Sequence, residues 1–446
     1  MHARSFILYL SLAAAPLSAQ QVGDTTVPRT LAAATARVTL ADALTRAVMV
    51  QPTTVQARGN AQNADAQQRS AYGAFLPSVN ATSNASQSYS EGRDRVDPLT
   101  SQIVTGDRSN RSLSMGLNAS LDLWTGLRRG ADISAANATD RSATAGLVNA
   151  RFQVTQQTTA AYLDALATQQ TVEVRVASVR RAQEQLKVSV AKLHAGSATR
   201  SDSLRSEVNL GNARIQLINA EIQQATAEAG LGRLIGADGR VAAIDDPAYT
   251  TQTAVDTTSI RAEARAQSPQ MLSAEAYLEV ARAQVRSAYA AYSPSLTLSG
   301  SYNFSGSSQE FGSNPLYNQR SVSLGLSWPL FNRFQREQTV ATRHSSVDLA
   351  ESQAGDARRQ VDAGVTQRLA ELAAARIRIE ITRSSVQAAR EDIRVIGERY
   401  RLGAATFVDL LTSQESLTQA EVDAVNARFD YLRAKAQVEA LIGRSL

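Results

Sequence analysis

The 446-residue chain has almost no cysteine or histidine side chains, and their scarcity disfavours several kinds of catalytic and metal site. It contains no cysteine, which excludes disulfides, thiolate metal sites, thiol catalysis and a lipid attached to an N-terminal cysteine. Its only histidines are His2, His194 and His344, which disfavours a histidine-rich metal site or a Ser-His-Asp enzyme. The motifs G-x-S-x-G, H-E-x-x-H and a glycine-rich phosphate loop with lysine are also missing. We therefore expect no enzyme, no cofactor and no metal.

Two aspartates occupy matching positions in a repeated motif. Gly196-Ser-Ala-Thr-Arg-Ser-Asp202 returns 207 residues later as Gly403-Ala-Ala-Thr-Phe-Val-Asp409. Each aspartate stands three residues after a threonine, and Thr-x-x-Asp is a capping box that opens a helix. Each glycine is suited to end the helix before it. One interpretation is therefore that both carboxylates only cap helices.

The same duplication organises the whole chain. Ala71-Tyr-Gly-Ala-Phe-Leu-Pro-Ser-Val79 returns as Ala288-Tyr-Ala-Ala-Tyr-Ser-Pro-Ser-Leu296, at an offset of 217 residues (288 − 71). The offset of 207 at the aspartate motif places a loop of variable length between the two blocks. We divide the chain into a secretory signal peptide (1–19), an N-terminal extension (20–38), a first repeat (39–236), a linker (237–258) and a second repeat (259–446).

The signal peptide prediction follows from Arg4, the apolar run 6–15 and the small residue Ala19 before the expected cleavage point. A short N-terminal anchor is the alternative. Beyond this segment no run of about 18 apolar residues exists, so the mature chain could enter a membrane only as strands. The net charge is +5, and the arginines are scattered among acidic residues without forming a basic block. This pattern predicts solvated helix faces and no nucleic-acid partner.

Long tracts without proline predict long helices. Residues 130–195 and 332–402 can each form one helix of about 65 residues, about 100 Å long. A second helix follows each of them after a glycine. In the first of these second helices, apolar and small residues recur at alternating spacings of four and three, which is typical of a coiled coil. These residues are Leu204, Val208, Gly211, Ile215, Ile218, Ile222, Ala225 and Ala229.

Alternating apolar and polar residues predict two strands in each repeat. The alternation is strict over 112–123 and 321–330 and weaker after Pro77 and Pro294. Strands of about ten residues with one apolar face match a transmembrane β-barrel. Four strands cannot close a barrel, so several copies must pool them, and a dimer, trimer or tetramer all satisfy this requirement.

Aromatic residues gather where the strands begin or end, and this placement predicts an aromatic girdle at the membrane surface. The alternative is that they pack the junctions between helices and strands. The girdle candidates are Tyr72, Phe75, Trp124, Tyr289, Tyr292, Trp328 and Phe331.

The order helix, two strands, very long helix, tip and helix, given twice, resembles the TolC-like outer-membrane efflux protein family. Tyr400-Arg-Leu-Gly-Ala-Ala-Thr-Phe-Val-Asp-Leu-Leu411 closely resembles the second periplasmic tip of that family, and Leu193–Asp202 is similar to the first. The resemblance covers both repeats. It implies a mainly α fold with β: a homotrimer whose 12-stranded transmembrane β-barrel, four strands per chain, continues into a 12-helix periplasmic α-barrel.

The resemblance also implies a function. The trimer would be a passive exit duct in the outer membrane, supplied by a periplasmic adaptor (membrane fusion protein) and an inner-membrane pump. Drug efflux and type I protein secretion both remain open. A periplasmic adaptor or coiled-coil scaffold without its own pore is the alternative, since it shares the signal peptide and long helices but leaves the strands unexplained.

The family's tip residues are transferred here only at matching positions. Asp409, with Asp202 from the other tip, implies a ring of carboxylates at the periplasmic constriction, and Tyr400 matches a locking tyrosine. Thr412 and Ala405 stand where relatives carry an acidic residue and an arginine, and Arg200 could replace that arginine. We expect a gate closed by packing and one acidic ring. An adaptor would dock at Ala195, Gly196, Ser197, Leu402, Gly403 and Ala404.

Overall fold

The computed structural model describes residues 36–92, 95–96, 99, 103–104, 108–245, 257–308 and 317–442. The predicted signal peptide and most of the N-terminal extension lie outside the described residues. The chain divides into a unit of residues 1–33 and a unit of residues 34–446, and all the elements below belong to the second.

Two very long helices dominate the structure, as the proline-free tracts predict. Helices α3 and α7 contain 67 residues each, which corresponds to about 100 Å. The shorter helices α1 and α5 end two residues before Pro52 and Pro269, because the residue before a proline disfavours helical backbone. The helices are α1 (Leu40–Val50), α2 (Pro52–Gly73), α3 (Arg128–His194), α4 (Arg200–Ile235), α5 (Thr257–Gln267), α6 (Pro269–Tyr289), α7 (Gln335–Arg401) and α8 (Phe407–Ile442).

The four predicted strands form one antiparallel sheet in the order β2-β5-β7-β8. They are β2 (Ser78–Ser90), β5 (Arg108–Trp124), β7 (Ser295–Ser308) and β8 (Tyr317–Ser327). The strand predicted over 321–330 ends at Ser327, because Pro329 has no N–H for the ladder. The sequence did not predict two short pairs: β3 (Arg95–Val96) with β4 (Ile103–Val104), and β1 (Ala36–Val38) with β6 (Val241–Ala243).

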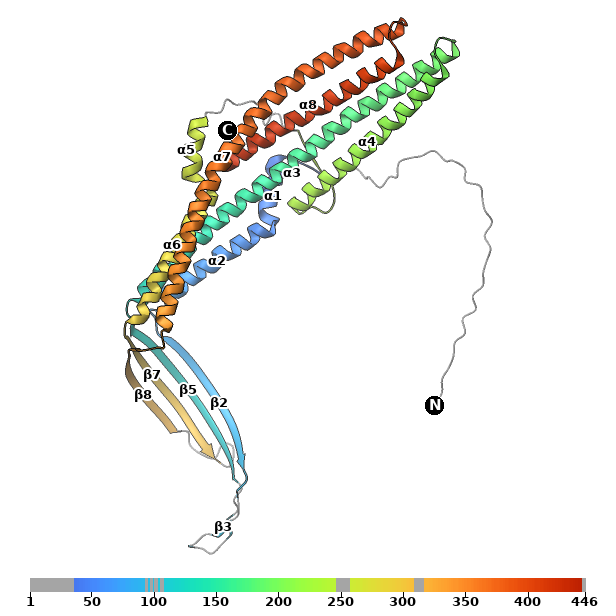
Figure 1. The fold of residues 1–446 in the computed structure, drawn as a ribbon. Helices are drawn as coiled ribbons and strands as arrows, with labels where there is room; N and C mark the ends of the chain where they lie inside the picture. Colours follow the sequence, from blue (N-terminus) through green and yellow to red (C-terminus); the bar gives the residue numbers. More distant parts are fainter. Residues whose placement is uncertain are drawn as a thin grey trace, which may run out of the picture. The chain divides into compact units, whose positions relative to one another are not determined.

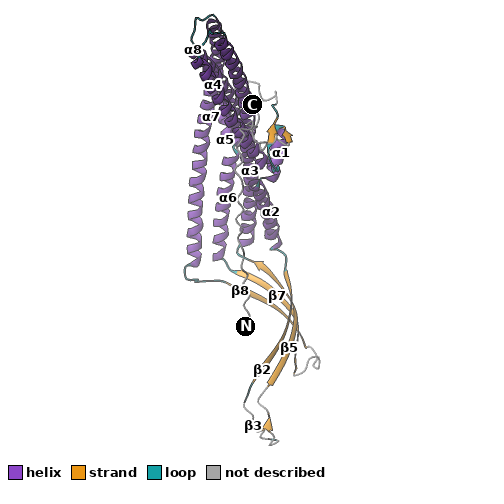
Figure 2. Cartoon of the chain, turned by 90° about the vertical axis from the view of Figure 1, so that its right-hand side faces the viewer, coloured by secondary structure: helices purple, strands orange, loops and turns teal. Residues whose placement is uncertain are grey.

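Each strand of the sheet is joined end to end with one helix: β2 with α2, β5 with α3, β7 with α6 and β8 with α7. These helices lie in the same order as the strands (Figures 1 and 2). Next to the sheet, α2 packs on α3, α3 on α6, and α6 on α7. Farther from the sheet, α4 replaces α2 and α8 replaces α6, which gives the order α4-α3-α8-α7 (Figure 1). The result is a layer four elements wide, with β2, α2 and α4 along one edge and β8 and α7 along the other.

The register separates the two faces of the sheet. Ser78, Ser120 and Ser299 lie side by side in one polar row, which Ser323 completes. The Ser78 and Ser120 hydroxyls are 2.8 Å apart. The opposite face is apolar and exposed, and includes Leu117 and Leu324. A sheet with one exposed apolar face is suited to contact lipid.

The main core lies where α1 and β6 pack against α3 and α4, and it continues to where α5 packs against α7 and α8. Tyr162 of α3 is only 2% exposed, and its hydroxyl oxygen lies 2.6 Å from the carbonyl oxygen of Ile244 and 3.2 Å from that of Val38, so both are within hydrogen-bonding reach of its one proton. This tyrosine therefore anchors both β1 and the residues after β6. The first part of the segment predicted as a linker is consequently ordered.

The coiled-coil register of α4 has no partner within the described part of the chain. Helix α4 packs on α3 through residues such as Leu210, whereas Leu204, Val208, Ile215, Ile218 and Ile222 are between 40% and 64% exposed. The matching helix α8 differs, since Val422, Phe429 and Leu432 are buried. In the described residues, no helix combines the length and the apolar character needed to cross a membrane.

Candidate functional site

The tips that join α3 to α4 and α7 to α8 lie at the same end of the helical layer (Figure 1). Gly196 and Gly403 have φ values of 69° and 74°, a conformation that glycine adopts without a steric penalty. After Gly196, the Ser197 N–H donates to the Lys192 carbonyl, and after Gly403 the Ala404 N–H donates to that of Arg399. These bonds satisfy the last carbonyls of both long helices. The predicted helix-ending role of the two glycines is therefore present in the structure.

Both predicted capping boxes are formed. At the first tip, the Thr199 N–H donates to the Asp202 carboxylate at 3.1 Å, and the Asp202 N–H donates to the Thr199 hydroxyl at 3.2 Å. At the second tip, the corresponding distances between Thr406 and Asp409 are 2.9 and 3.2 Å. The Thr406 N–H and hydroxyl, with a smaller contribution from Arg399, hold the pKa of the Asp409 carboxyl below its usual value. Asp409 is exposed, so it carries its negative charge at the surface of the tip.

Tyr400 of α7 contacts the other hairpin. The ammonium group of Lys192 of α3 donates a hydrogen bond to the Tyr400 carbonyl at 3.1 Å, and the same nitrogen lies 4.0 Å from the centroid of the Tyr400 ring. Burial, and next the charge of Asp202, raise the pKa of Tyr400, whereas the nearby polar side chains of Ser189 and Gln185 act in the opposite direction. The cation–π contact and the hydrogen bond from Lys192 hold the two tips together within one chain.

The remaining predicted gate residues lie at the tips without joining this cluster. Thr412 is exposed on α8 and donates its hydroxyl to the Val408 carbonyl at 3.0 Å. Arg200 is exposed at the start of α4, and within the described residues it forms no ion pair. Sequence reasoning missed Lys192, Ser189 and Gln185, although the lysine in the last turn of α3 is a recognisable helix-end feature.

The predicted docking residues are exposed at both tips: Ala195, Gly196, Ser197, Leu402, Gly403 and Ala404. A Cβ atom placed on Gly196 or Gly403 would meet nothing within 4 Å. The backbone at these glycines is therefore open to another molecule, which is compatible with docking and with their role in ending helices.

The predicted girdle residues lie where the sheet meets the helices. Six of the seven are about half exposed or more, namely Tyr72, Phe75, Trp124, Tyr289, Trp328 and Phe331, and Tyr292 is slightly less exposed. Several of them also contact the junctions: Phe75 lies beneath Arg129, Tyr292 lies beneath Arg336, and the Trp328 indole N–H donates to the Tyr292 carbonyl at 3.2 Å. The girdle and junction interpretations are therefore compatible.

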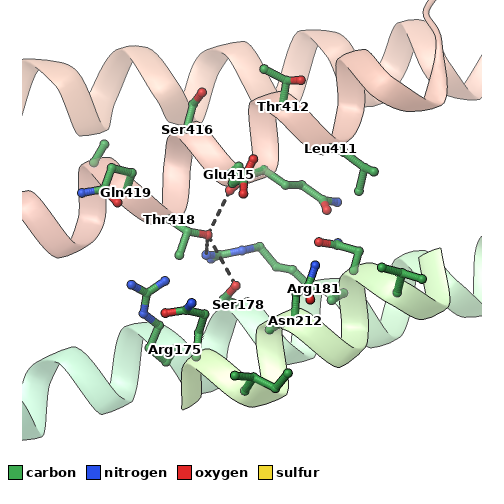
Figure 3. A pocket seen from close by; sticks show the side chains of 18 of the residues that line it. Arg175, Ser178, Arg181, Asn212, Leu411, Thr412, Glu415, Ser416, Thr418 and Gln419 are labelled. Atoms are coloured by element: carbon green, nitrogen blue, oxygen red, sulfur yellow. Dashed lines mark hydrogen bonds between the residues drawn. The ribbon is translucent and has the colours of Figure 1, made fainter. Parts of the chain in front are cut away.

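A groove of about 1400 Å³ runs between the two hairpins (Figure 3). Arg181 of α3, which lines the groove, donates to the Thr418 hydroxyl at 3.0 Å and to the Glu421 carboxylate at 3.1 Å, so it links α3 to α8. Thr412 and Glu415 line the α8 side. In the described residues, no group of three metal-ligating side chains is placed to hold a metal ion. The groove and tips offer surfaces for passage and contact, and the described residues do not assemble a catalytic constellation.

Comparison with known proteins identifies the family. The sequence profile of the family described as "Outer membrane efflux protein" matches residues 44–237 and 260–444. The alkaline protease secretion protein AprF of Pseudomonas aeruginosa is 28% identical over 289 residues, which cover 64% of this chain and 60% of that protein. The protein CyaE of Bordetella pertussis is 27% identical over 58% of this chain and 56% of its own length. The chain thus spans under two thirds of the length of both relatives.

The fold also matches solved structures. The CmeC outer membrane channel of Campylobacter jejuni superimposes with a TM-score of 0.75 over 91% of this chain and 85% of that one, at 17% sequence identity. At this identity the likeness concerns the fold, and it confirms the duplicated arrangement of long helices with four strands.

Proposed function

The chain belongs to the outer membrane efflux protein family, and we propose that three copies of it form an exit duct that conducts substrates passively across the periplasm and outer membrane. The observation that carries the proposal is the shared order of strands and helices. Because each strand continues a helix, sheet and helices make one wall from the sheet to the tips. Such a wall encloses a channel only when further copies close it.

The edges of the sheet are suited to that closure. In the described residues, β2 and β8 each pair with a neighbour on one side only, and they run in opposite directions. The β8 strand of one copy can therefore pair in antiparallel fashion with the β2 strand of the next. A bilayer does not tolerate unpaired strand edges, so a membrane location requires this pairing. Family membership supports three copies and hence twelve strands.

The helical edges support the same arrangement. Helix α4, at one edge, presents the exposed apolar stripe of Leu204, Val208, Ile215, Ile218 and Ile222. Helix α7, at the other edge, exposes Leu349, Ile377 and Ile381. Two different apolar surfaces on opposite edges favour a head-to-tail contact between copies, which closes into a ring. The coiled-coil register of α4 then finds its partner in the next copy.

The proposed duct has no energy source of its own, so its partners are an inner-membrane pump and a periplasmic adaptor. The name of the Pseudomonas aeruginosa relative refers to secretion of an alkaline protease. That name supports type I protein secretion as the process that this chain serves. A tripartite drug pump could use the same passive duct, so drug efflux is the second candidate. At the tips, Asp409 and Asp202 would form the acidic ring, with Tyr400, Thr412 and Arg200 around the constriction.

Conductance tests the proposal against its alternative. Purified protein added to planar lipid bilayers should produce discrete conductance steps. A periplasmic adaptor or coiled-coil scaffold without a pore should produce none, and it leaves the four-stranded sheet without a role. The absence of steps from protein that is folded and inserted in the bilayer would reject the exit-duct proposal.

Docking of the adaptor at the tips is tested at Gly403. Gly403→Trp should leave the assembly intact and lower export at least tenfold, because the space beside this glycine would be filled. Gly403→Asn is the matched control, since asparagine tolerates positive φ and adds little bulk. Export and assembly state are measured for both variants in cells. Normal export by the tryptophan variant would show that no partner docks at this position.

A further inference from the structure

The two junctions between strand and long helix are built by the same contacts, although most of their residues differ. Residues 122–129 join β5 to α3, and residues 329–336 lead from the end of β8 into α7, 207 positions later (329 − 122). Only two positions are identical between these segments, the leucines 123 and 330 and the arginines 129 and 336. A contact that recurs on such different residues points to a shared requirement of the two junctions.

The backbone makes the same unusual turn at both junctions. Gly126 and Leu127 have φ values of 62° and 67°, and Arg333 and Phe334 have values of 57° and 62°. Left-handed backbone is unfavourable for a residue with a side chain, so three of these four residues are strained. Such a turn persists only when surrounding contacts hold it.

A polar side chain of the turn accepts a hydrogen bond from the first turn of each long helix. The backbone N–H of Arg129 donates to the Thr125 hydroxyl at 3.4 Å. The backbone N–H of Arg336 donates to the Asn332 side-chain oxygen at 3.5 Å. Thr125 and Asn332 are again 207 positions apart, so different residue types supply the same acceptor.

The arginine side chain then reaches back to the end of the strand. Arg129 donates to the carbonyl of Asp122. Arg336 donates to the carbonyl of Pro329 at 2.7 Å and to that of Leu330 at 3.1 Å. Asp122 and Pro329 occupy matching positions, so both guanidinium groups bind the backbone at the same place.

Each guanidinium group also lies over an aromatic ring from the segment before its repeat's first strand. The Arg129 group is 5.0 Å from the centroid of Phe75, and the Arg336 group is 4.7 Å from that of Tyr292. Phe75 and Tyr292 match in the duplicated motif that precedes β2 and β7. Each arginine thus joins a strand end, the first turn of a long helix and the end of the preceding helical segment.

We propose that Arg129 and Arg336 are positioning residues that set the angle at which α3 and α7 leave the sheet. A guanidinium group can donate in two directions within one plane while it stacks on a ring, which an ammonium group cannot do. The neighbouring Arg128 lacks these contacts: its side chain is 55% exposed and its guanidinium nitrogen is 4.0 Å from the Asp122 carboxylate. Such a surface pair contributes little.

The natural absence of cysteine makes the proposal directly measurable by spin labelling. One label pair is introduced as Ser114→Cys on β5 with Thr144→Cys on α3. The other is introduced as Ser323→Cys on β8 with Ser345→Cys on α7. Labelled chains are mixed with an excess of the cysteine-free chain, so that pulsed electron paramagnetic resonance reports distances within one chain.

Arg129→Gln should at least double the width of the β5–α3 distance distribution and leave the β8–α7 distribution unchanged. Arg336→Gln should do the reverse, so each junction is the control for the other. Arg128→Gln should change neither distribution. Assembly, measured by particle mass, should be retained in all three variants, which separates positioning from a general loss of fold.

Glutamine variants that keep native widths would overturn the proposal. If a glutamine variant does not fold, the corresponding lysine variant is measured instead. A broadened distance distribution then supports the positioning role of the arginine, and a native width contradicts it. Because the distances lie within one chain, the result does not depend on the number of copies or on conduction. Failure of the exit-duct proposal would therefore leave this test intact.

Discussion

Ile215→Asp is expected to lower the assembled form to less than one-tenth of its native amount while single chains stay folded. Ile215 is 56% exposed in the single chain and lies in the apolar stripe of α4, so an aspartate there costs the isolated chain little. In the proposed ring the same side chain is enclosed by α7 of the next copy. An unpaired carboxylate enclosed in an interface costs several kcal/mol, and a three-copy ring repeats that cost at each of its interfaces.

Particle mass in detergent measures this effect directly. Gln223→Asp is the matched control, because it adds the same charge to an exposed polar position of α4 beside the stripe. This control should assemble like the native protein. Native amounts of assembled Ile215→Asp would show that the α4 stripe does not form the contact between copies.

Replacing both tip aspartates with asparagine is expected to remove block of the channel by trivalent cations. The proposed ring would place like charges from three chains around one constriction. Two unit charges 4 Å apart interact with an energy of about 1 kcal/mol in bulk water and about 4 kcal/mol near a protein surface. Loss of the ring should therefore weaken the affinity for the blocker by at least about a hundredfold.

Asparagine separates the two roles of these residues. Its side-chain oxygen can still accept the hydrogen bond from the Thr199 or Thr406 N–H, so Asp202→Asn with Asp409→Asn keeps the starts of α4 and α8 but removes the charges. Asp409→Ala removes both functions at the second tip. Asp238→Asn, at the far end of α4 from the tip, is the control for general loss of negative charge and should leave block unchanged. Block of the double asparagine variant at native concentrations would leave capping as the only role.

Local patterns made the elements of this fold predictable. Tracts without proline predicted α3 and α7, and period-two alternation predicted the four strands of the sheet. The capping boxes and the left-handed glycines were equally predictable, because each depends on residues within about six positions of one another. Their agreement in two copies of the repeat strengthened the prediction.

Contacts between distant residues were not predictable in the same way. Lys192 and Tyr400 stand 208 positions apart (400 − 192), and their contact depends on how the two hairpins lie side by side. The pairing of β1 with β6 involves three residues in each strand, too few for a periodic pattern. Tyr162 joins this pair from a third element, so its role emerges only from the packed core.

The α4 stripe shows how a correct periodicity can leave its partner undetermined. Its spacing predicted a coiled coil, and the structure places the stripe on the exposed side of α4. Val422 and Phe429 of α8, which match Ile215 and Ile222, are buried within the chain, although both helices belong to the same duplicated unit. Periodicity identifies the apolar face of a helix, whereas the position of that helix in the layer determines whether the face meets the same chain or another.

The measurement that tests the central claim most directly is electron microscopy of detergent-extracted protein, with chain number determined from particle mass. The account predicts a threefold hollow cylinder longer than about 100 Å, as helices of 67 residues require. A water-soluble particle of one or two chains without a central channel would contradict the exit-duct account.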